Sequence, residues 1–335
     1  MSFATLHSVA ARIAALSLVF AGALSTAHAD GSQGKPTGVL AKQIRIIVPF
    51  TPGTGMDSLA RLFAEQVRQR WGSTVVVDNR PGASGNIGSL AVAQAAPDGT
   101  TLMMTANTFV ITPPLYRNVP YDVVKDFAPV GQVAIGQLAL AVHPSLNVGT
   151  LREFIAAAKA APGRIDYASP GVGTPQHLSM ESLKLAAGIS LTHIPYRGSA
   201  GAVQDLVGGT VKAMILPVHT ARPLALDNRI RLLGVAGATR APAMPQLATF
   251  QEQGLGGFAV DLWYGLYAPG RTPPEAIAQL NDELVAVLAD PGVRETVSKL
   301  GMTVKSGPPS ELAQLTRDDL AAWTRVINTA GIKAE

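Results

Sequence analysis

Short β-branched runs alternate with amphipathic segments along most of this chain, and no other feature of the sequence constrains the fold as strongly. Residues 44–50, 74–78 and 101–105 are apolar runs of the kind that form buried parallel strands. Between them, residues 56–71 and 86–96 have the spacing of amphipathic helices, with apolar side chains on one face. A strand–helix–strand–helix–strand order favours a parallel sheet with right-handed crossovers. We therefore expect an α/β fold.

The same alternation restarts in the second half of the chain. Predicted helices at 151–161, 176–187 and 200–207 alternate with predicted strands at 165–168, 191–196, 211–216 and 230–235. Extended stretches at 127–143 and 258–268 would carry the chain between two α/β lobes, and helices near 274–288, 292–300 and 310–327 would complete it. We expect a discontinuous first lobe (42–138 and 262–330) and an inserted second lobe (139–261), each with a parallel-rich sheet.

The N-terminal segment has the features of a secretory signal. Arg12 is the only Lys or Arg among the first thirty residues, residues 13–24 are apolar, and Ala27-His28-Ala29 matches a leader-peptidase site. The apolar run is shorter than the roughly 20 residues that a membrane span needs. The pattern predicts a cleaved signal peptide at 1–29 and a periplasmic mature protein, with an uncleaved anchor as the alternative.

Composition and motifs exclude several functional classes. The chain has no cysteine, which excludes disulfides and thiolate chemistry. Its formal charge of +4 is spread without a Lys/Arg run, so we expect no nucleic-acid partner. There is no Gly-x-Ser-x-Gly and no phosphate-binding Gly-Lys-Ser/Thr motif, and no two histidines are spaced as metal ligands on a helix. We expect no cofactor, no metal and no enzymatic activity. A hydrolase or isomerase without a familiar motif is the enzymatic alternative.

An ordered set of short motifs carries a family resemblance. It includes Val-Pro-Phe-Thr-Pro-Gly-Thr-Gly-Met-Asp at 48–57, Asp-Asn-Arg-Pro-Gly-Ala-Ser-Gly-Asn-Ile-Gly at 78–88, and Pro-Tyr-Arg-Gly-Ser at 195–199. Together with further matches between residues 44 and 301, these motifs closely resemble the substrate-binding proteins of tripartite tricarboxylate transporters, the Bug family. One departure is Thr54, which stands where family members usually have a second adjacent glycine.

The resemblance implies a fold, a location and a function. The fold would be the two-lobed periplasmic-binding-protein type (type II, venus flytrap). The protein would act as a monomer in the periplasm, and would capture a small carboxylate (a di- or tricarboxylate, an amino acid or an aromatic acid) in the cleft between its lobes. It would deliver this ligand to the membrane permease subunits of a tripartite transporter. The alternative within the same class is a receptor that feeds a two-component sensor.

The first predicted ligand loop lies between a strand and a helix. Glycines let the backbone approach a ligand, and the first turn of the helix offers free amides and partial positive charge. Asp57 has three interpretations: it could complement the helix dipole, pair with a ligand ammonium, or hold a bridging water. From this region we expect ligand contacts from Phe50, Thr51, Gly53, Thr54, Gly55, Met56 and Asp57, and from Thr105 and Asn107 after the third strand.

The second lobe repeats the arrangement after the strand that ends near residue 168. Thr174 is a predicted N-cap with Pro175 at the first helical position. His177 could donate to the ligand or make a structural hydrogen bond, and Arg197 could bind a carboxylate or pair with a surface acid. Phe50, Phe109 and Trp263 could line the pocket or belong to the core. The predicted contacts of this lobe are Ser169, Gly171, Gly173, Thr174, His177, Tyr196, Arg197 and Gly198.

Overall fold

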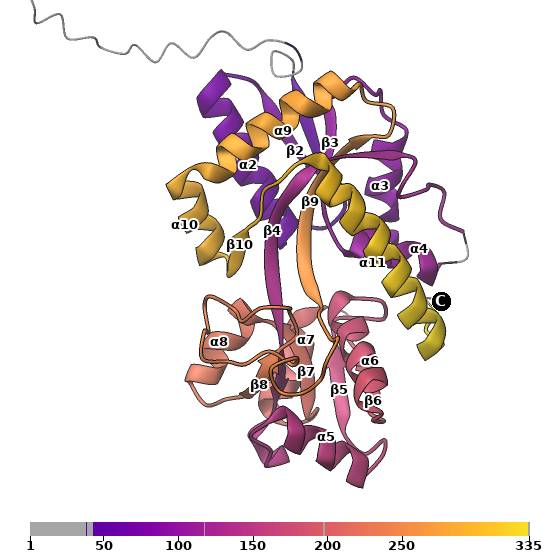
Figure 1. Cartoon of the computed structure of the whole chain (residues 1–335), viewed down its shortest axis with the longest axis vertical. Helices are drawn as coiled ribbons and strands as arrows, with labels where there is room; N and C mark the ends of the chain where they lie inside the picture. Colours follow the sequence, from indigo (N-terminus) through magenta and orange to yellow (C-terminus); the bar gives the residue numbers. More distant parts are fainter. Residues whose placement is uncertain (1–37, 39–42, 117, 197, 334–335) are drawn as a thin grey trace, which may run out of the picture. The chain divides into compact units, whose positions relative to one another are not determined.

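A computed structural model describes residues 38, 43–116, 118–196 and 198–333, and all of these belong to one compact unit. The predicted signal peptide and Arg197 lie outside the described residues. Ten strands of the described chain form one mixed sheet with helices on both of its faces (Figure 1), which confirms the predicted α/β class. Within the same ranges, no helix is both long and apolar enough to cross a membrane.

The first three strands form a parallel group, as predicted. They are β1 (Ile44–Val48), β2 (Val75–Asn79) and β3 (Thr101–Ala106), and β1 lies between the other two. The connecting helices are α2 (Gly55–Trp71) and α3 (Asn86–Ala93), the latter preceded by a single 3₁₀ turn at Ala83–Gly85. Helix α3 ends earlier than its apolar pattern predicted, and Gln94 is its C-cap.

A second parallel group follows the same principle. Its strands are β5 (Asp166–Ser169), β6 (Thr192–Pro195) and β7 (Ala213–Pro217), with β5 in the middle. Its helices are α5 (Leu151–Ala160), α6 (Pro175–Ala187) and α7 (Ser199–Gly208). In both groups the carboxyl ends of the strands lead into helix N-termini, which is the edge where α/β proteins place ligands.

Two long strands join the groups, and both run antiparallel to their neighbours. β4 (Phe127–Val142) pairs with β9 (Asp261–Pro269) along one part, and with β7 and β8 (Arg231–Val235) along the other. β9 also pairs with β3, so the sheet order is β2-β1-β3-β9-β4-β7-β5-β6. The sequence predicted these extended crossings. Their antiparallel pairing makes the sheet mixed, because each crossing runs against the parallel strands beside it.

Three elements were not predicted from the sequence. They are α4 (Thr108–Leu115), α8 (Val218–Leu226) and the short β10 (Met302–Val304), which pairs with β4. Prolines lie inside α4 (Pro113 and Pro114) and inside α8 (Pro223), and proline normally argues against a helix interior. Both helices contribute buried residues to the core clusters, so tertiary packing outweighs their poor helix propensity.

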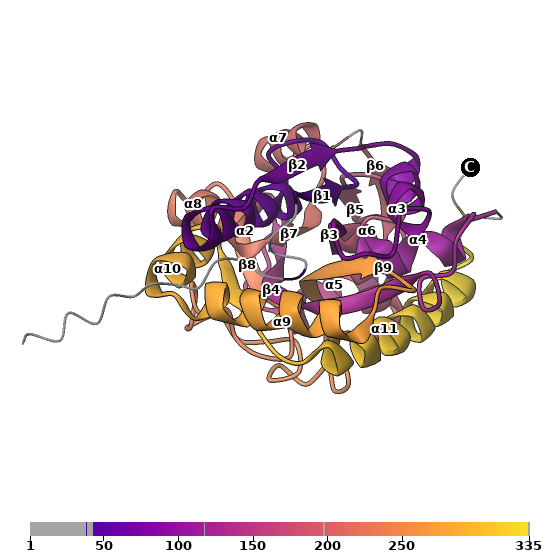
Figure 2. The same cartoon turned by 90° about the horizontal axis from the view of Figure 1, so that it is seen from above.

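The C-terminal helices complete the layers. They are α9 (Pro274–Ala289), α10 (Pro291–Lys299) and α11 (Pro309–Ala330). Figure 2 shows α9 and α10 beside α2, and α11 beside α4. One core cluster joins α2, α9 and α10 to the first strands, and another joins α4, α5, α6 and α11. Phe109 and Trp263 are buried in the second cluster, so the core interpretation holds for both.

Candidate functional site

The loop between β1 and α2 is fixed by side chains of its own helix. Thr54 is the N-cap of α2, and its Oγ1 accepts a hydrogen bond from the Asp57 amide at 3.3 Å. The Asp57 carboxylate reaches back and accepts from the Gly53 amide at 2.9 Å. Gly53 has a φ of 84°, a left-handed conformation that glycine adopts without strain. Contacts within the protein therefore set the shape of this loop.

Asp57 anchors the loop through both of its carboxylate oxygens. Oδ2 also accepts from Arg61 Nε at 3.1 Å, and Oδ1 accepts from Asn79 Nδ2 and lies 3.0 Å from Arg61 Nη2. Burial alone would raise the pKa of Asp57, but the hydrogen bonds from Arg61, Gly53 and Asn79 outweigh it and hold this pKa below its usual value. Of the three predicted roles, these contacts favour a structural one, in which the charge of Asp57 is already paired.

The neighbouring residues tie this loop to the rest of the sheet edge. Asn79, at the end of β2, also donates from Nδ2 to the Phe50 carbonyl at 3.1 Å. Phe50 is half-buried, and its ring lies against Gly85. Thr51 is exposed and Met56 is buried. Asn79 therefore supports the loop after β1, and the loops after β1 and β2 lie side by side.

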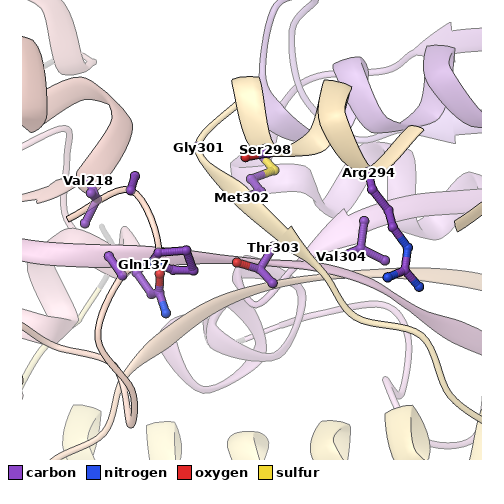
Figure 3. A pocket seen from close by; sticks show the side chains of 11 residues that line it. Gln137, Val218, Arg294, Ser298, Gly301, Met302, Thr303 and Val304 are labelled. Carbon is purple, nitrogen blue, oxygen red and sulfur yellow. The ribbon is translucent and has the colours of Figure 1, made fainter. Parts of the chain in front are cut away.

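A cavity of about 230 Å³ lies between β4, β10, α10 and the start of α8 (Figure 3). Gln137, Val218, Arg294, Met302 and Thr303 are among the residues that line it. Met302 connects it to the loop, since a Cβ on Gly55 would come within 2.6 Å of Met302 Cε and 2.7 Å of the Tyr264 hydroxyl. None of the predicted site residues lines this cavity.

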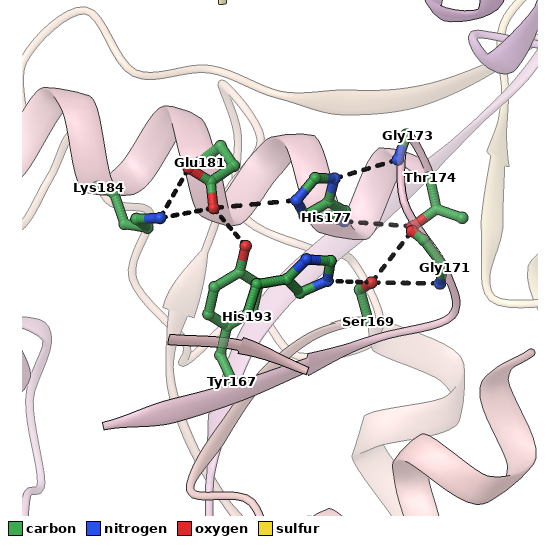
Figure 4. A network of polar contacts seen from close by, with 9 residues as sticks. All are labelled: Tyr167, Ser169, Gly171, Gly173, Thr174, His177, Glu181, Lys184 and His193. Atoms are coloured by element: carbon green, nitrogen blue, oxygen red, sulfur yellow. Dashed lines mark hydrogen bonds and ion pairs between the residues drawn. The ribbon is translucent and has the colours of Figure 1, made fainter. Parts of the chain in front are cut away.

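The loop between β5 and α6 is built in the same way (Figure 4). Thr174 is the N-cap of α6 and Pro175 is its first residue, as predicted. Thr174 Oγ1 accepts from the His177 amide at 3.3 Å and donates to the Gly171 carbonyl at 2.8 Å. The Gly173 amide donates to His177 Nδ1 at 3.1 Å, and Gly173 has a φ of 77°. Of the two roles predicted for His177, this contact is the structural one.

Both loops therefore share one local device, Gly-Thr-x-x-acceptor. In each, the glycine amide donates to a side chain four residues later, and the threonine hydroxyl accepts the amide of that same later residue. The acceptor is a carboxylate at Asp57 and an imidazole at His177. The first amides of a helix have no acceptor within the helix and carry partial positive charge. Two fixed helix N-termini of this kind are suited to hold an anion.

His177 belongs to a stacked group inside the second loop. Its ring lies 4.0 Å from that of His193, and the ring of Tyr167 stacks on His193 at 4.8 Å. Burial, followed by the neighbouring charges, lowers the pKa of His177 to about 3. Burial likewise lowers the pKa of His193 to about 4, against an opposing effect of Glu181. Both imidazoles are therefore neutral at physiological pH.

The remaining second-lobe residues lie next to this loop. The Gly198 amide donates to the Pro170 carbonyl at 2.9 Å, which joins the loops after β5 and β6. Ser169 is fully buried, and its hydroxyl is bonded to Gly171 and His193. The Tyr196 hydroxyl donates to Asp205 at 2.5 Å. The Ser169 and Tyr196 hydroxyls therefore make hydrogen bonds within the protein, and their predicted ligand contacts remain predictions.

Unpartnered polar atoms mark the carboxyl end of β3. Among the described side chains, Thr105 Oγ1, Asn107 Oδ1, Thr108 Oγ1 and Asp261 Oδ1 are buried and lack a hydrogen-bond partner. Asn107 Nδ2 donates to the Asp261 carbonyl at 3.1 Å, which joins this group to the start of β9. Burial raises the pKa of Asp261. Buried polar groups are rarely left unpaired, so these atoms are candidates to meet a ligand or a water.

Two of these residues were not predicted. Thr108 has a signal in the sequence, because it follows Asn107 directly after a strand. Asp261 has none, since it begins an extended segment whose pairing with β3 and β4 is long-range. Arg61, Glu181 and His193 were also missed. Arg61 and Glu181 could have been found from their spacing, because residues four apart on a helix are neighbours.

The second loop contacts the first parallel group directly, and the first loop lies next to a contact between the two halves of the sheet. A Cβ on Gly173 would overlap the Leu115 side chain at the end of α4. On the other side of the molecule, a Cβ on Gly301 would overlap His219 of α8, and Met302 next to it reaches Gly55. Both candidate loops therefore lie where the two halves of the sheet meet.

Replacing Gly173 by Ala is expected to destabilise the protein and weaken carboxylate binding. The left-handed φ and the overlap with Leu115 together should cost about 2–4 kcal/mol of unfolding free energy. Gly188→Ala at the other end of α6 is a matched control, because Gly188 has a φ of 61° and open space around it. It should cost only the conformational strain of about 1–2 kcal/mol. Denaturant unfolding and calorimetric titration check both variants, and equal losses would contradict the role of Leu115.

Comparisons with known proteins identify the family of the chain. A family model described as the tripartite tricarboxylate transporter family receptor matches residues 59–332. A UPF0065 protein of Pseudomonas sp. strain P51, from the tcbD–tcbE intergenic region, is 38% identical over 288 residues, which is 86% of each chain.

Solved structures give the same result. The periplasmic binding protein BugD is 31% identical, with a TM-score of 0.74 over 88% of this chain and 99% of that one. Rpa4515 of R. palustris, solved with adipate, is 34% identical, with a TM-score of 0.76 over 87% and 98%. These matches confirm the resemblance seen in the sequence motifs, and with it the periplasmic-binding-protein fold. The chain belongs to the tripartite tricarboxylate transporter receptor family, also represented by the Bug proteins.

Proposed function

We propose that this protein is a periplasmic solute receptor that binds a small carboxylate between its two lobes. It delivers that ligand to the membrane permease subunits of a tripartite tricarboxylate-type transporter, and acts as a monomer without turning the ligand over. The observation that carries the proposal is the Gly-Thr-x-x-acceptor device at the N-termini of both α2 and α6. The arrangement occupies the Gly53, Asp57, Gly173 and His177 amides. Pro175 has no amide hydrogen, so the first-turn amides left to hold an anion without a lysine are those of Gly55, Met56 and Gln176.

Further observations support a carboxylate as the ligand. The charge of Asp57 is paired with Arg61, and the acceptor in the second loop is a neutral imidazole, so neither anchor adds a free negative charge. The unpartnered atoms around Asn107 leave polar groups for the rest of the ligand. A relative of similar fold was solved with adipate, a dicarboxylate. Dicarboxylates are therefore the first class to test.

The proposed lobes follow the two parallel groups. Residues 42–138 and 262–330 form the first lobe, and residues 139–261 form the second, with β4 and β9 as the connections. Bringing two helix N-termini onto one ligand would couple binding to lobe closure. Residues 1–29 are proposed to be the signal peptide that exports the chain.

A thermal-shift screen of the mature protein tests this function. Dicarboxylates, tricarboxylates, amino acids and aromatic acids would be added singly, and a binder at about 100 times its Kd should add about 2.7 kcal/mol of stability. Titration calorimetry should then give one ligand per chain, and mass spectrometry should recover the acid unchanged. Failure of every acid to shift the melting temperature, or chemical conversion of the bound acid, would overturn the proposal.

A further inference from the structure

Two stacked imidazoles support the second candidate loop from inside. His177 comes from the first turn of α6 and His193 from β6, and their rings are nearly parallel, with 16° between the planes. His177 is only 3% exposed. The His177 ring therefore lies inside the protein, while His193 is partly exposed, and both rings can position the loop backbone.

The two histidines hold different parts of the loop. His177 Nδ1 accepts the hydrogen bond from the Gly173 amide. His193 Nε2 lies 2.7 Å from Ser169 Oγ, and that hydroxyl accepts from the Gly171 amide at 3.2 Å. One imidazole thus fixes the end of the loop at the helix, and the other fixes its start after β5.

Glu181, with its partners Tyr167 and Lys184, lies on the other side of the stack. Glu181 accepts a hydrogen bond from the Tyr167 hydroxyl, and both of its oxygens accept from Lys184 Nζ, at 2.7 and 2.8 Å (Figure 4). Its Oε1 lies 3.9 Å from His177 Nε2, beyond hydrogen-bond distance. Because Lys184 balances the charge of Glu181, no unpaired carboxylate is available to hold a proton on either imidazole.

We propose that His177 and His193 are positioning residues of the carboxylate site: through the Gly173 and Ser169–Gly171 hydrogen bonds they fix the loop 169–174, and with it the Gln176 amide in the first turn of α6. This inference rests on the proposed function. The essential atoms are the acceptor at His177 Nδ1 and the hydrogen-bonding partner at His193 Nε2. Ring stacking keeps both rings in place.

Two pairs of variants separate positioning from packing. His177→Asn places an amide oxygen at the position of Nδ1, whereas His177→Leu fills the space without an acceptor. His193→Gln can place a polar atom near Nε2, whereas His193→Leu cannot. The Leu variants are expected to bind the best dicarboxylate from the screen about tenfold more weakly, which corresponds to one lost buried hydrogen bond. The Asn and Gln variants should stay within about threefold of wild type, because they retain that bond.

A second measurement on ligand-free protein makes the test independent of the ligand. Hydrogen exchange of the Gly173 amide should be slow in wild type and His177→Asn and fast in His177→Leu, while ¹⁵N spectra should show His177 with an unprotonated Nδ1. If no acid binds the wild type, the proposed function fails. The exchange of the Gly173 amide still tests whether His177 fixes the loop. Equal affinity losses in the Asn and Leu variants, or equal Gly173 exchange in both, would overturn the inference.

Discussion

Replacing Asp57 by Ala is expected to destabilise the protein by about 3 kcal/mol and to abolish measurable carboxylate binding. The side chain accepts hydrogen bonds from Gly53, Arg61 and Asn79, and it is 4% exposed. Hydrogen bonds to a charged group are worth about 1.5–3 kcal/mol, and removing one partner of a buried pair costs more. Arg61 is half-exposed and can be solvated by water, which limits the loss.

Asp290→Ala is the matched control for this variant. Asp290 is the N-cap of α10 and accepts from the Val293 amide at 3.0 Å, so it is also an acid at a helix start. Its loss should cost about 1 kcal/mol, a typical value for a cap, and should leave affinity unchanged. Denaturant unfolding and titration calorimetry measure both effects. An Asp57→Ala variant that binds dicarboxylates like the wild type would show that the anchored loop is not part of the site.

Asp57→Asn separates anchoring from ligand recognition. An asparagine keeps one acceptor, but its Nδ2 would face Asn79 Nδ2 or Arg61, so two donors would oppose each other. The structural role predicts an intermediate loss of stability and an equal loss of affinity for all carboxylates. A selective loss of amino-acid binding would instead indicate that Asp57 meets a ligand ammonium.

The strand–helix order was predictable because it depends on local patterns. The runs at β1, β3 and β7 are mostly apolar and buried, with the exposed Arg45 of β1 as an exception. The local sequence also predicted the N-cap at Thr174, because a threonine followed by a proline is a typical helix start. Helices α4 and α8 were not predictable, because each contains proline and is stabilised by packing that the local sequence does not encode.

The candidate site was predictable only in its backbone. Glycines and threonines after strands indicated where the loops lie, because carboxyl ends of parallel strands meet at one edge. The side chains that fix those loops come from elsewhere: Asn79 from β2 reaches Asp57, and His193 from β6 reaches Ser169. Such contacts depend on strand order, which the sequence pattern does not specify. For this reason the sequence left three interpretations of Asp57 open, whereas the contacts with Gly53, Arg61 and Asn79 favour a structural role.

The two loops differ in how their anchors respond to pH. Asp57 is an ionised acid paired with Arg61, so the stability that it contributes is retained at pH values above the range of carboxylate pKa values. The anchor of the second loop is a neutral imidazole, and protonation would remove the acceptor at Nδ1. Because an unfolded histidine takes up its proton well above the carboxylate range, acid should lower the stability that the second anchor contributes before it lowers that of the first.

Stability is expected to fall by about 4 kcal/mol between pH 7 and pH 5 because of His177 and His193. Burial lowers the pKa of His177 to about 3 and that of His193 to about 4, whereas an unfolded histidine has a pKa of about 6.5. Below pH 6.5 the unfolded chain takes up protons that the folded chain does not, so stability falls with pH until the folded pKa values are reached. Each histidine contributes about 2 kcal/mol over this interval, which lies above most carboxylate pKa values.

The double variant His177→Asn/His193→Gln isolates this contribution. It removes both imidazoles and leaves Glu181, Lys184 and Tyr167 around the stack, as well as His219, whose pKa is also lowered by burial. Between pH 7 and pH 5 it should lose about 4 kcal/mol less stability than the wild type, and each single variant about 2 kcal/mol less. Urea unfolding at a series of pH values measures the difference. Wild type and double variant could instead show parallel curves of unfolding free energy against pH. The two imidazoles would then be protonated in the folded protein as readily as in the unfolded chain, and the interpretation of the stack as neutral would be wrong.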